Sequence, residues 1–210
     1  MSSEVKLSAV LVAGSRRKRA QRVVDAVAAQ TALSEIELVI VDLAREEIPP
    51  FKVPDNLRSV YVRRPGTTRW GIARSEGVRA ANGDIVAFIE DHCFPEPEWA
   101  SILIEEHRNG WGAVGYAFKS GNPESFVARA SLLGRYGDFV HPAHRRQAAL
   151  VGGNNVSYKR DLLLSFGKEL EDLLSIDFNL QEKLSKRGVP LFIESRALAA
   201  HENFQSVVQE

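Results

Sequence analysis

Short apolar runs alternate with segments of helical periodicity through the first half of the chain. Runs rich in Val, Leu and Ile predict strands, because β-branched side chains favour extended backbone and central parallel strands are apolar throughout. Segments whose apolar residues recur every three or four positions, as Ala20, Val23, Val24 and Val27 do, predict helices with one buried stripe. A proline-containing loop is predicted at residues 49–55. The predicted strands are residues 7–13, 36–41, 57–62 and 84–89, and the predicted helices are residues 17–30, 68–81 and 97–107.

The second half of the chain shows weaker periodicity. A polar segment with histidines and proline predicts a loop at residues 137–147, and Gly152-Gly153 followed by Asn154-Asn155 predicts a tight backbone turn. The predicted strands here are residues 111–118, 149–151, 156–158 and 190–194, and the predicted helices are residues 123–136, 161–166 and 175–186. Strands that alternate with helices predict an α/β fold with a doubly wound, mostly parallel sheet. No repeat or linker interrupts the pattern, so we expect one domain over residues 1–210.

Composition is typical of a soluble globular protein, with 44% hydrophobic and 26% charged residues. The formal net charge is +0, so no global field would draw the chain to nucleic acid or to an anionic membrane. No apolar stretch approaches the roughly 18 residues of a membrane span. The apolar run at residues 7–14 lacks the charge order of a signal peptide, because Glu4 offsets Lys6 and a basic cluster follows. The single cysteine, Cys93, forms no internal disulfide, and we therefore expect a cytoplasmic protein.

One predicted strand ends abruptly in three polar residues, Glu90, Asp91 and His92. Asp42 ends another predicted strand in the same way. In open α/β sheets, ligands bind beyond the carboxyl ends of the strands, so these side chains could face one crevice. Carboxylate oxygens and imidazole nitrogens are ligands for Mn²⁺ or Mg²⁺, which in turn would hold phosphate oxygens. The alternative is a strand that simply ends in solvated polar residues before a loop.

Further segments occur in a particular order along the chain. Val41-Asp42 is followed by GIARSEG from Gly71 to Gly77 and by AANGDIVAFIEDH from Ala80 to His92. Later come VGGNNVSYKR from Val151 to Arg160 and D-x-x-L-x-x-K-L-x-x-x-G from Asp177 to Gly188. In this order the five segments resemble the signatures of family 2 glycosyltransferases, which include F-L-D-x-D and G-x-N-x-A-x-R-R. The resemblance covers essentially the whole chain.

This resemblance implies a GT-A fold, a Rossmann-like sheet with a nucleotide-binding half at about residues 1–95 and an acceptor half at about residues 96–210. It also implies inverting transfer of a hexosyl-type sugar from a nucleoside-diphosphate sugar, for which we expect a UDP-sugar, assisted by Mn²⁺ or Mg²⁺. The acceptor would be a glycan, a lipid-linked molecule or a small molecule, and no nucleic acid would be bound. The implied roles are the catalytic base for Asp177, nucleotide binding for Asp42, Arg74, Glu90, Asp91 and Arg16, acceptor binding for Gly153, Asn154 and Asn155, and metal binding for Asp91, His92 and His201.

The chain departs from the family pattern at three places. His92 stands where the second aspartate of D-x-D would bind the metal, and an imidazole brings no negative charge. The family's V-D-D-G-S is here Val41-Asp42-Leu43-Ala44-Arg45, and its E-D pair is Ile176-Asp177. These departures keep open a second hypothesis, a nucleotide-sugar-binding or scaffolding domain without turnover. A nucleotidyltransferase is a weaker third option, because Ala13-Gly14-Ser15-Arg16-Arg17 only faintly resembles its glycine-rich loop.

The basic cluster from Arg16 to Arg19 opens the first predicted helix. Backbone N–H groups at a helix start and guanidinium groups both suit a diphosphate. We expect Arg16 to be the residue that contacts ligand, and Lys18 and Arg19 to be solvated. Other histidines, His141 and His144, are expected in a loop without a ligand role.

Overall fold

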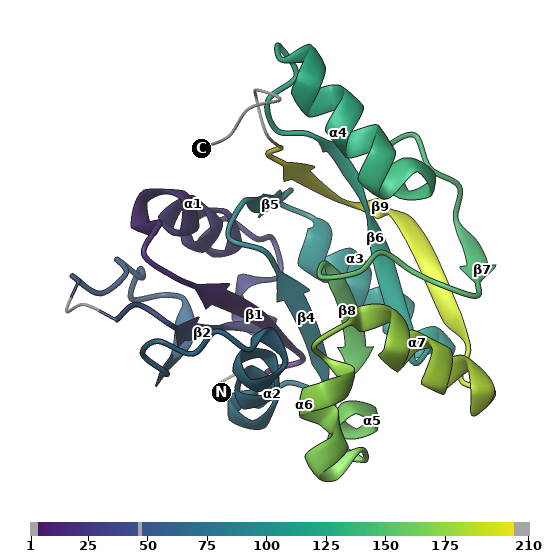
Figure 1. The fold of residues 1–210 in the computed structure, drawn as a ribbon, viewed down its shortest axis with the longest axis horizontal. Helices are drawn as coiled ribbons and strands as arrows, with labels where there is room; N and C mark the ends of the chain where they lie inside the picture. Colours follow the sequence, from purple (N-terminus) through teal and green to yellow (C-terminus); the bar gives the residue numbers. More distant parts are fainter. Residues whose placement is uncertain (1–3, 46–47, 204–210) are drawn as a thin grey trace.

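A computed structural model of the chain describes residues 4–45 and 48–203. Its strands form one sheet with the order β3-β2-β1-β4-β8-β6-β9-β5, and β7 pairs with β9 (Figure 1). The strands are β1 (Leu7–Ala13), β2 (Ile36–Asp42), β3 (Arg58–Arg63), β4 (Ile85–Ile89), β5 (Cys93–Pro95), β6 (Ala113–Ser120), β7 (Arg146–Ala148), β8 (Val156–Lys159) and β9 (Leu191–His201).

The amino-terminal part of this sheet is parallel throughout. β1 pairs in parallel with β2 and with β4, and β2 pairs in parallel with β3. β8 is antiparallel to both β4 and β6, and β9 returns to the parallel direction beside β6. The mostly parallel α/β sheet predicted from the alternating pattern is therefore confirmed, and it is consistent with the Rossmann-like GT-A fold.

Helices cover both faces of the sheet. They are α1 (Arg17–Ala28), α2 (Trp70–Ala80), α3 (Trp99–Glu106), α4 (Phe126–Tyr136), α5 (Arg160–Leu164), α6 (Leu170–Leu173) and α7 (Asp177–Lys186), with short 3-10 turns η1 (Leu33–Glu35), η2 (His107–Asn109), η3 (Gly137–Phe139) and η4 (Gly167–Glu169). Alternate side chains of β1 enter two different cores, as a pleated strand buried on both faces requires. One core packs against α1 and α3, and the other against α2 and the α5–α7 segment.

The sequence placed the last strands wrongly. Residues 149–151 are not a strand; the strand is β7, which overlaps the end of the predicted loop and is held by antiparallel pairing with β9. The final strand does not end at residue 194 but continues to His201. The polar stretch Glu194-Ser195-Arg196 hid this continuation, because it forms an irregularity where the register of β9 against β6 shifts. Beyond it, β9 pairs with both β6 and β5.

Within the described residues, no helix has the length and apolarity needed to cross a membrane.

Candidate active site

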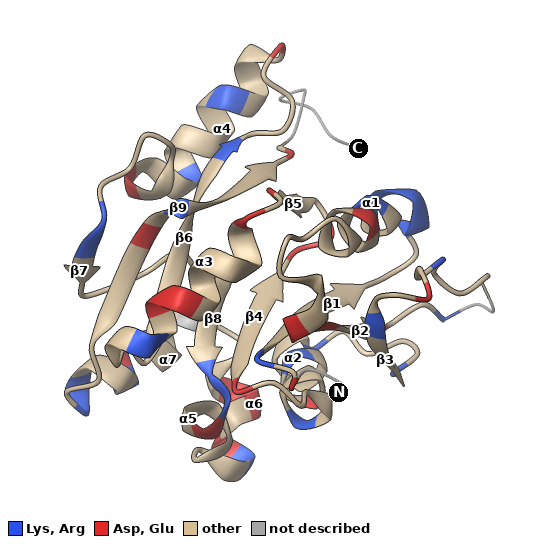
Figure 2. Cartoon of the chain, turned by 180° about the vertical axis from the view of Figure 1, so that it is seen from behind, with Lys and Arg blue, Asp and Glu red and all other residues tan. Residues whose placement is uncertain are grey.

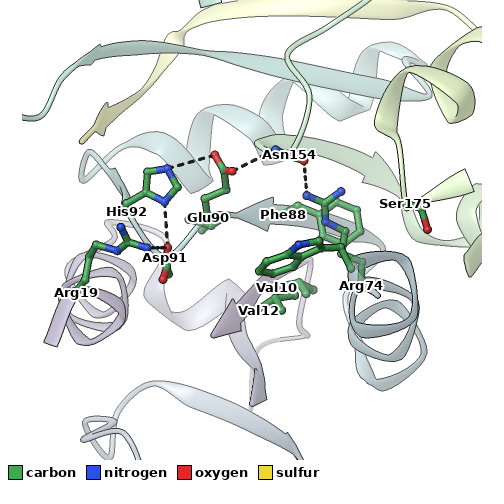
Figure 3. Close-up of a pocket in the computed structure, with 12 residues that line it drawn as sticks. Val10, Val12, Arg19, Arg74, Phe88, Glu90, Asp91, His92, Asn154 and Ser175 are labelled. Carbon is green, nitrogen blue, oxygen red and sulfur yellow. Dashed lines mark hydrogen bonds and ion pairs between the residues drawn. The ribbon is translucent and has the colours of Figure 1, made fainter. Parts of the chain in front are cut away.

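A cavity of about 410 Å³ opens at the carboxyl ends of β1 and β4 (Figure 3). Apolar side chains of the two strands, including Val12 and Phe88, line one part of it. Polar side chains line the rest, and they come from α1, α2, the segment after β4 and the turn before β8. The cavity therefore lies where open α/β sheets bind their ligands.

Glu90 is the centre of the polar side of this cavity. Asn155 Nδ2 donates to its Oε2 at 2.6 Å, the Tyr136 hydroxyl donates to the same oxygen at 3.2 Å, and Asn154 Nδ2 donates to Oε1 at 3.1 Å. His201 Nε2 lies 3.3 Å from Oε2. Burial alone would raise the pKa of Glu90, but the hydrogen bond from His201, the charges of His92 and His201 and the hydrogen bond from Asn155 together lower it to about 2. Glu90 is therefore a carboxylate at any physiological pH.

Glu90, His92 and His201 form a cluster with metal-ligating chemistry. Their ligand atoms all lie within 4.8 Å of one another, and the two imidazole rings are 4.6 Å apart. His201 arrives there because Cys93 of β5 pairs directly with it, which sets the end of β9 beside the segment after β4. Two imidazoles and a carboxylate suit a divalent transition ion and leave coordination positions for ligand oxygens. The residues present thus fit such an ion.

Asp91 points in another direction. Its Oδ1 accepts a hydrogen bond of 2.5 Å from Arg19 Nη2 and lies 3.0 Å from His92 Nδ1 (Figure 3). Burial would raise its pKa, but the bonds to His92 and Arg19 lower it. Of the three predicted metal ligands, the structure groups His92 and His201 with Glu90 and pairs Asp91 with a cation. In this position Asp91 orients one ring nitrogen of His92, as a carboxylate behind a histidine ligand does.

The basic cluster at the start of α1 is arranged differently from what we expected. Arg16 is exposed at the N-cap position, whereas Arg19 is half-buried and lines the cavity. Arg17 Nη2 donates to Asp42 Oδ2 at 2.5 Å. Arg19 is therefore not the solvated residue predicted from sequence.

Asp42 is completely buried at the end of β2. Besides Arg17, its carboxylate accepts hydrogen bonds from the Tyr61 hydroxyl and, at 3.0 Å, from the Ala44 backbone N–H. Burial would raise its pKa, but the hydrogen bonds from Arg17, Tyr61 and Ala44 lower it. A direct contact between Asp42 and a nucleotide, as predicted, would have to share or replace these partners.

Arg74 is buried in α2 and joins three parts of the site. Its Nη1 donates to the Leu174 carbonyl at 3.1 Å, its Nη2 donates to Asn154 Oδ1, and its guanidinium lies 5.7 Å from the centre of the Phe88 ring. Helix α2 can pack closely against α6 because residue 71 is a glycine. A Cβ at Gly71 would lie 1.8 Å from the Glu171 carbonyl oxygen. The GIARSEG motif thus sets Arg74 against the cavity.

The predicted acceptor segment forms a turn between the cavity and β8. Asn154 has a left-handed φ of 60°, a conformation that asparagine tolerates better than most residues. The Gly153 carbonyl accepts a bond of 2.7 Å from the Asn155 N–H. The side chains of Asn154 and Asn155 both hold Glu90, so the structure gives them a supporting contact that the sequence did not suggest; their contact with an acceptor remains a prediction.

Asp177 is the first residue of α7, and its side chain lies outside the described part of the structure. Ile176 takes the N-cap position and makes no side-chain capping bond. Ser175, two residues earlier, lines the cavity. The backbone thus brings Asp177 near the mouth of the cavity, and its role as base remains a prediction.

Sequence reasoning missed Arg17, Arg19, Tyr61 and Tyr136. One signal was available for Arg19: it lies one helical turn before Val23, so it continues the buried stripe of the predicted helix toward the end of β1. For Tyr61 and Tyr136 there was no comparable signal, because their partners are 19 and 46 residues away.

The order of the strands and the position of the cavity together define an α/β protein of the class that binds its ligand beyond the carboxyl ends of parallel strands. Residues 8–163 match Glycosyl transferase family 2, and the chain belongs to that family. It is also similar to glucosyl-dolichyl phosphate glucuronosyltransferase of Haloferax volcanii, with 30% identity over 155 residues. The aligned region is 69% of this chain and 49% of that protein, so the chain spans about half the length of this relative.

Proposed function

We propose that the chain is an inverting glycosyltransferase that moves a hexosyl-type sugar from a UDP-sugar to an acceptor hydroxyl, with a divalent metal ion at Glu90, His92 and His201. The observation that carries this proposal is the position of the three side chains. Glu90 and His92 line the cavity at the carboxyl ends of β1 and β4, and the buried His201 lies beside them, in a chain that belongs to glycosyl transferase family 2.

Cationic side chains support a diphosphate in this cavity. Arg19 and Arg74 both line it, and His92 lies between Arg19 and Glu90 (Figure 3). Within residues 4–45 and 48–203, Arg19 Nε is buried without a hydrogen-bond partner. Because a buried donor without an acceptor costs roughly 1–3 kcal/mol, a ligand phosphate oxygen would relieve it.

The donor set also bears on the choice of ion. Mg²⁺ prefers six oxygen ligands, whereas imidazole nitrogen suits transition ions, so we propose Mn²⁺ ahead of Mg²⁺. When bound, such an ion supplies Lewis-acid stabilisation of the charge that develops on the leaving diphosphate.

The chain's own residues would carry the displacement as follows. Asp177 accepts the proton of the acceptor hydroxyl, and the freed oxygen electron pair forms a bond to the anomeric carbon of the sugar. The bond from that carbon to the diphosphate oxygen breaks on the opposite face, which inverts the configuration. Arg19 and Arg74 hold the diphosphate, and Asp42, through Arg17 and Tyr61, shapes the site for the nucleoside.

The acceptor is the least constrained part of the proposal. A lipid-linked acceptor is favoured over a glycan or a small molecule by the name of the Haloferax relative, which includes a dolichyl phosphate substrate. The cytoplasm is the proposed setting, because the lone, buried Cys93 suits a reducing compartment.

Calorimetric titration with UDP, with and without Mn²⁺, tests the site. We expect Mn²⁺ to raise UDP affinity, and we expect slow hydrolysis of the matching UDP-sugar in the absence of acceptor. Equal UDP affinity with and without Mn²⁺ would contradict the metal assignment. UDP binding without hydrolysis or transfer of any UDP-sugar would favour the binding-domain hypothesis instead.

A further inference from the structure

Large hydrophobic side chains are exposed on one part of this molecule. Among the described residues, seven such side chains are exposed, and one of them, Tyr61, is explained by its bond to Asp42. The other six lie on the start of α2, on α4, before β8 and at the start of α7: Trp70, Phe126, Leu133, Leu150, Ile176 and Phe178. Contiguous exposed apolar surface marks an interaction site more often than a solvated one.

Four of the six lie at the cavity, at a second hollow or on the short segment between the two. Trp70 and Ser175 line the cavity itself, and Ile176 follows Ser175 directly. Phe178, two residues after Ile176, lines a second hollow of about 410 Å³ together with Leu150. Phe139, just after α4, lines the same hollow. Apolar side chains therefore occur at the cavity, at the start of α7 and in the second hollow, whose rim also carries the ion pair of Arg146 with Asp138.

Helix α4 carries the other two exposed side chains, and its inner side contacts the candidate active site. Tyr136 donates to Glu90 from the last turn of α4, and Leu132 is buried in the core. On the outer side, Phe126 is 74% and Leu133 is 58% exposed, at positions i and i+7 of one stripe. In Figure 1, α4 lies above and α7 below the segment that carries β7.

The charged residues of α4 indicate which kind of partner would bind the exposed apolar stripe of Phe126 and Leu133. The helix holds two arginines, Arg129 and Arg135, and no carboxylate, and Figure 2 shows both basic positions in blue. Arg129 and Arg135 are both exposed. Apolar side chains between basic ones are the pattern of a helix that lies in the interface of an anionic bilayer. This local field is compatible with a net charge of +0, because it acts only within about a Debye length of the surface.

We propose that this surface, made of Trp70, Leu150, Ile176, Phe178 and the outer stripe of α4, docks on an anionic lipid membrane. The cavity would then open toward the bilayer, and a lipid-linked acceptor would present its hydroxyl to the cavity while its hydrocarbon remains in or against the membrane. This inference rests on the proposed function for its purpose, but membrane docking itself is measurable without any turnover.

Sedimentation with vesicles tests the proposal. We expect the protein to sediment with vesicles of phosphatidylcholine and phosphatidylglycerol, and at least tenfold less with phosphatidylcholine alone, with binding weakened by high salt. Phe126→Ser with Leu133→Ser should lower binding at least tenfold, and Leu150→Ser with Phe178→Ser should also lower it. Arg129→Gln with Arg135→Gln should remove the preference for phosphatidylglycerol. Arg108→Gln, an exposed cation in η2, is the matched control and should bind like the parent.

The outcomes separate this inference from the proposed function. Circular dichroism and UDP titration in solution report folding and the nucleotide site of each variant, and Phe126→Ser with Leu133→Ser should leave both unchanged. If UDP binds but no protein sediments with either vesicle, membrane docking is wrong while the proposed function stands. Sedimentation that is equal in parent and variants would also overturn it. Dimers that dissociate on the same substitutions would show that a second copy covers the surface instead.

Discussion

At the scale of single residues, Asp42 shows how a predicted ligand-binding group can have a structural task. Its side chain is fully buried and is bonded by Arg17, Tyr61 and the Ala44 N–H. Asp42→Asn keeps the size but removes the charge that offsets Arg17. We expect the free energy of unfolding to fall by about 1.5–3 kcal/mol, measured by urea denaturation. Arg63→Gln is the control, because Arg63 is 37% exposed and 3.3 Å away, and should cost less than about 1 kcal/mol. An Asp42→Asn protein as stable as the parent would contradict this account.

Substitutions of Arg19 and His201 should separate two contributions to the proposed nucleotide binding. Arg19→Gln removes a cation beside the cavity and should weaken UDP binding by about 1.5–3 kcal/mol whether Mn²⁺ is present or not. His201→Gln should leave metal-free binding near that of the parent and remove the increment from Mn²⁺. His144→Gln, in an exposed loop position, serves as the control for a lost histidine. Loss of the Mn²⁺ increment in Arg19→Gln alone would show that the two roles are reversed.

At the scale of elements, the position of Asp177 at the start of α7 determines how its structural and catalytic roles can be told apart. Ile176 is the N-cap and Asp177 the first helical residue, a position where a carboxylate is favoured by the helix dipole. Asp177→Asn should therefore cost at most about 1 kcal/mol of stability. If Asp177 is the base, turnover should fall roughly 10²–10⁴-fold with little change in donor affinity. Near-parent turnover in Asp177→Asn would move the search to Asp172 and Glu171.

The elements also show what sequence patterning could and could not supply. The parallel strands and α1, α2 and α3 were predicted within a few residues, because each is specified by its own apolar periodicity. β5 and β7 were missed and β9 was cut short, because these segments are strands only through pairing with residues far along the chain. The same reason limited how much of the candidate site could be predicted from the sequence. Glu90, Asp91 and His92 were evident as a strand end, whereas the meeting of Glu90 with Tyr136 depends on how α4 packs.

At the scale of the whole molecule, His107 links stability to pH. It is buried in η2, and its Nε2 lies 2.9 Å from the Ser157 hydroxyl oxygen of β8. Burial, with a smaller effect from the charge of Lys159, lowers its pKa from 6.5 to about 4. Between these pH values the unfolded chain binds more protons than the native one, so the free energy of unfolding falls as the pH falls through this window.

The expected size of this effect is about 3 kcal/mol between pH 7 and pH 4, since one unit of pKa corresponds to about 1.4 kcal/mol. His107→Gln can still form a hydrogen bond but cannot titrate. Urea denaturation of parent and variant at the two pH values should therefore show a smaller loss on acidification in the variant. An identical loss in both proteins would mean that other groups dominate the acid response.

Residues Glu90 and His201, which meet in the site, are 111 positions apart, and β9 carries the second of them. The strand is also the neighbour of β5, β6 and β7. A chain emerging from the ribosome thus exposes unpaired edges of β5, β6 and β7 until β9 inserts, and open edges invite association with other chains. Ribosome-arrested chains that end before and after residue 201 should differ in chaperone retention and protease resistance. Equal behaviour of the two would contradict this dependence. The cluster of Glu90, His92 and His201 would therefore assemble only after β9 has been synthesised.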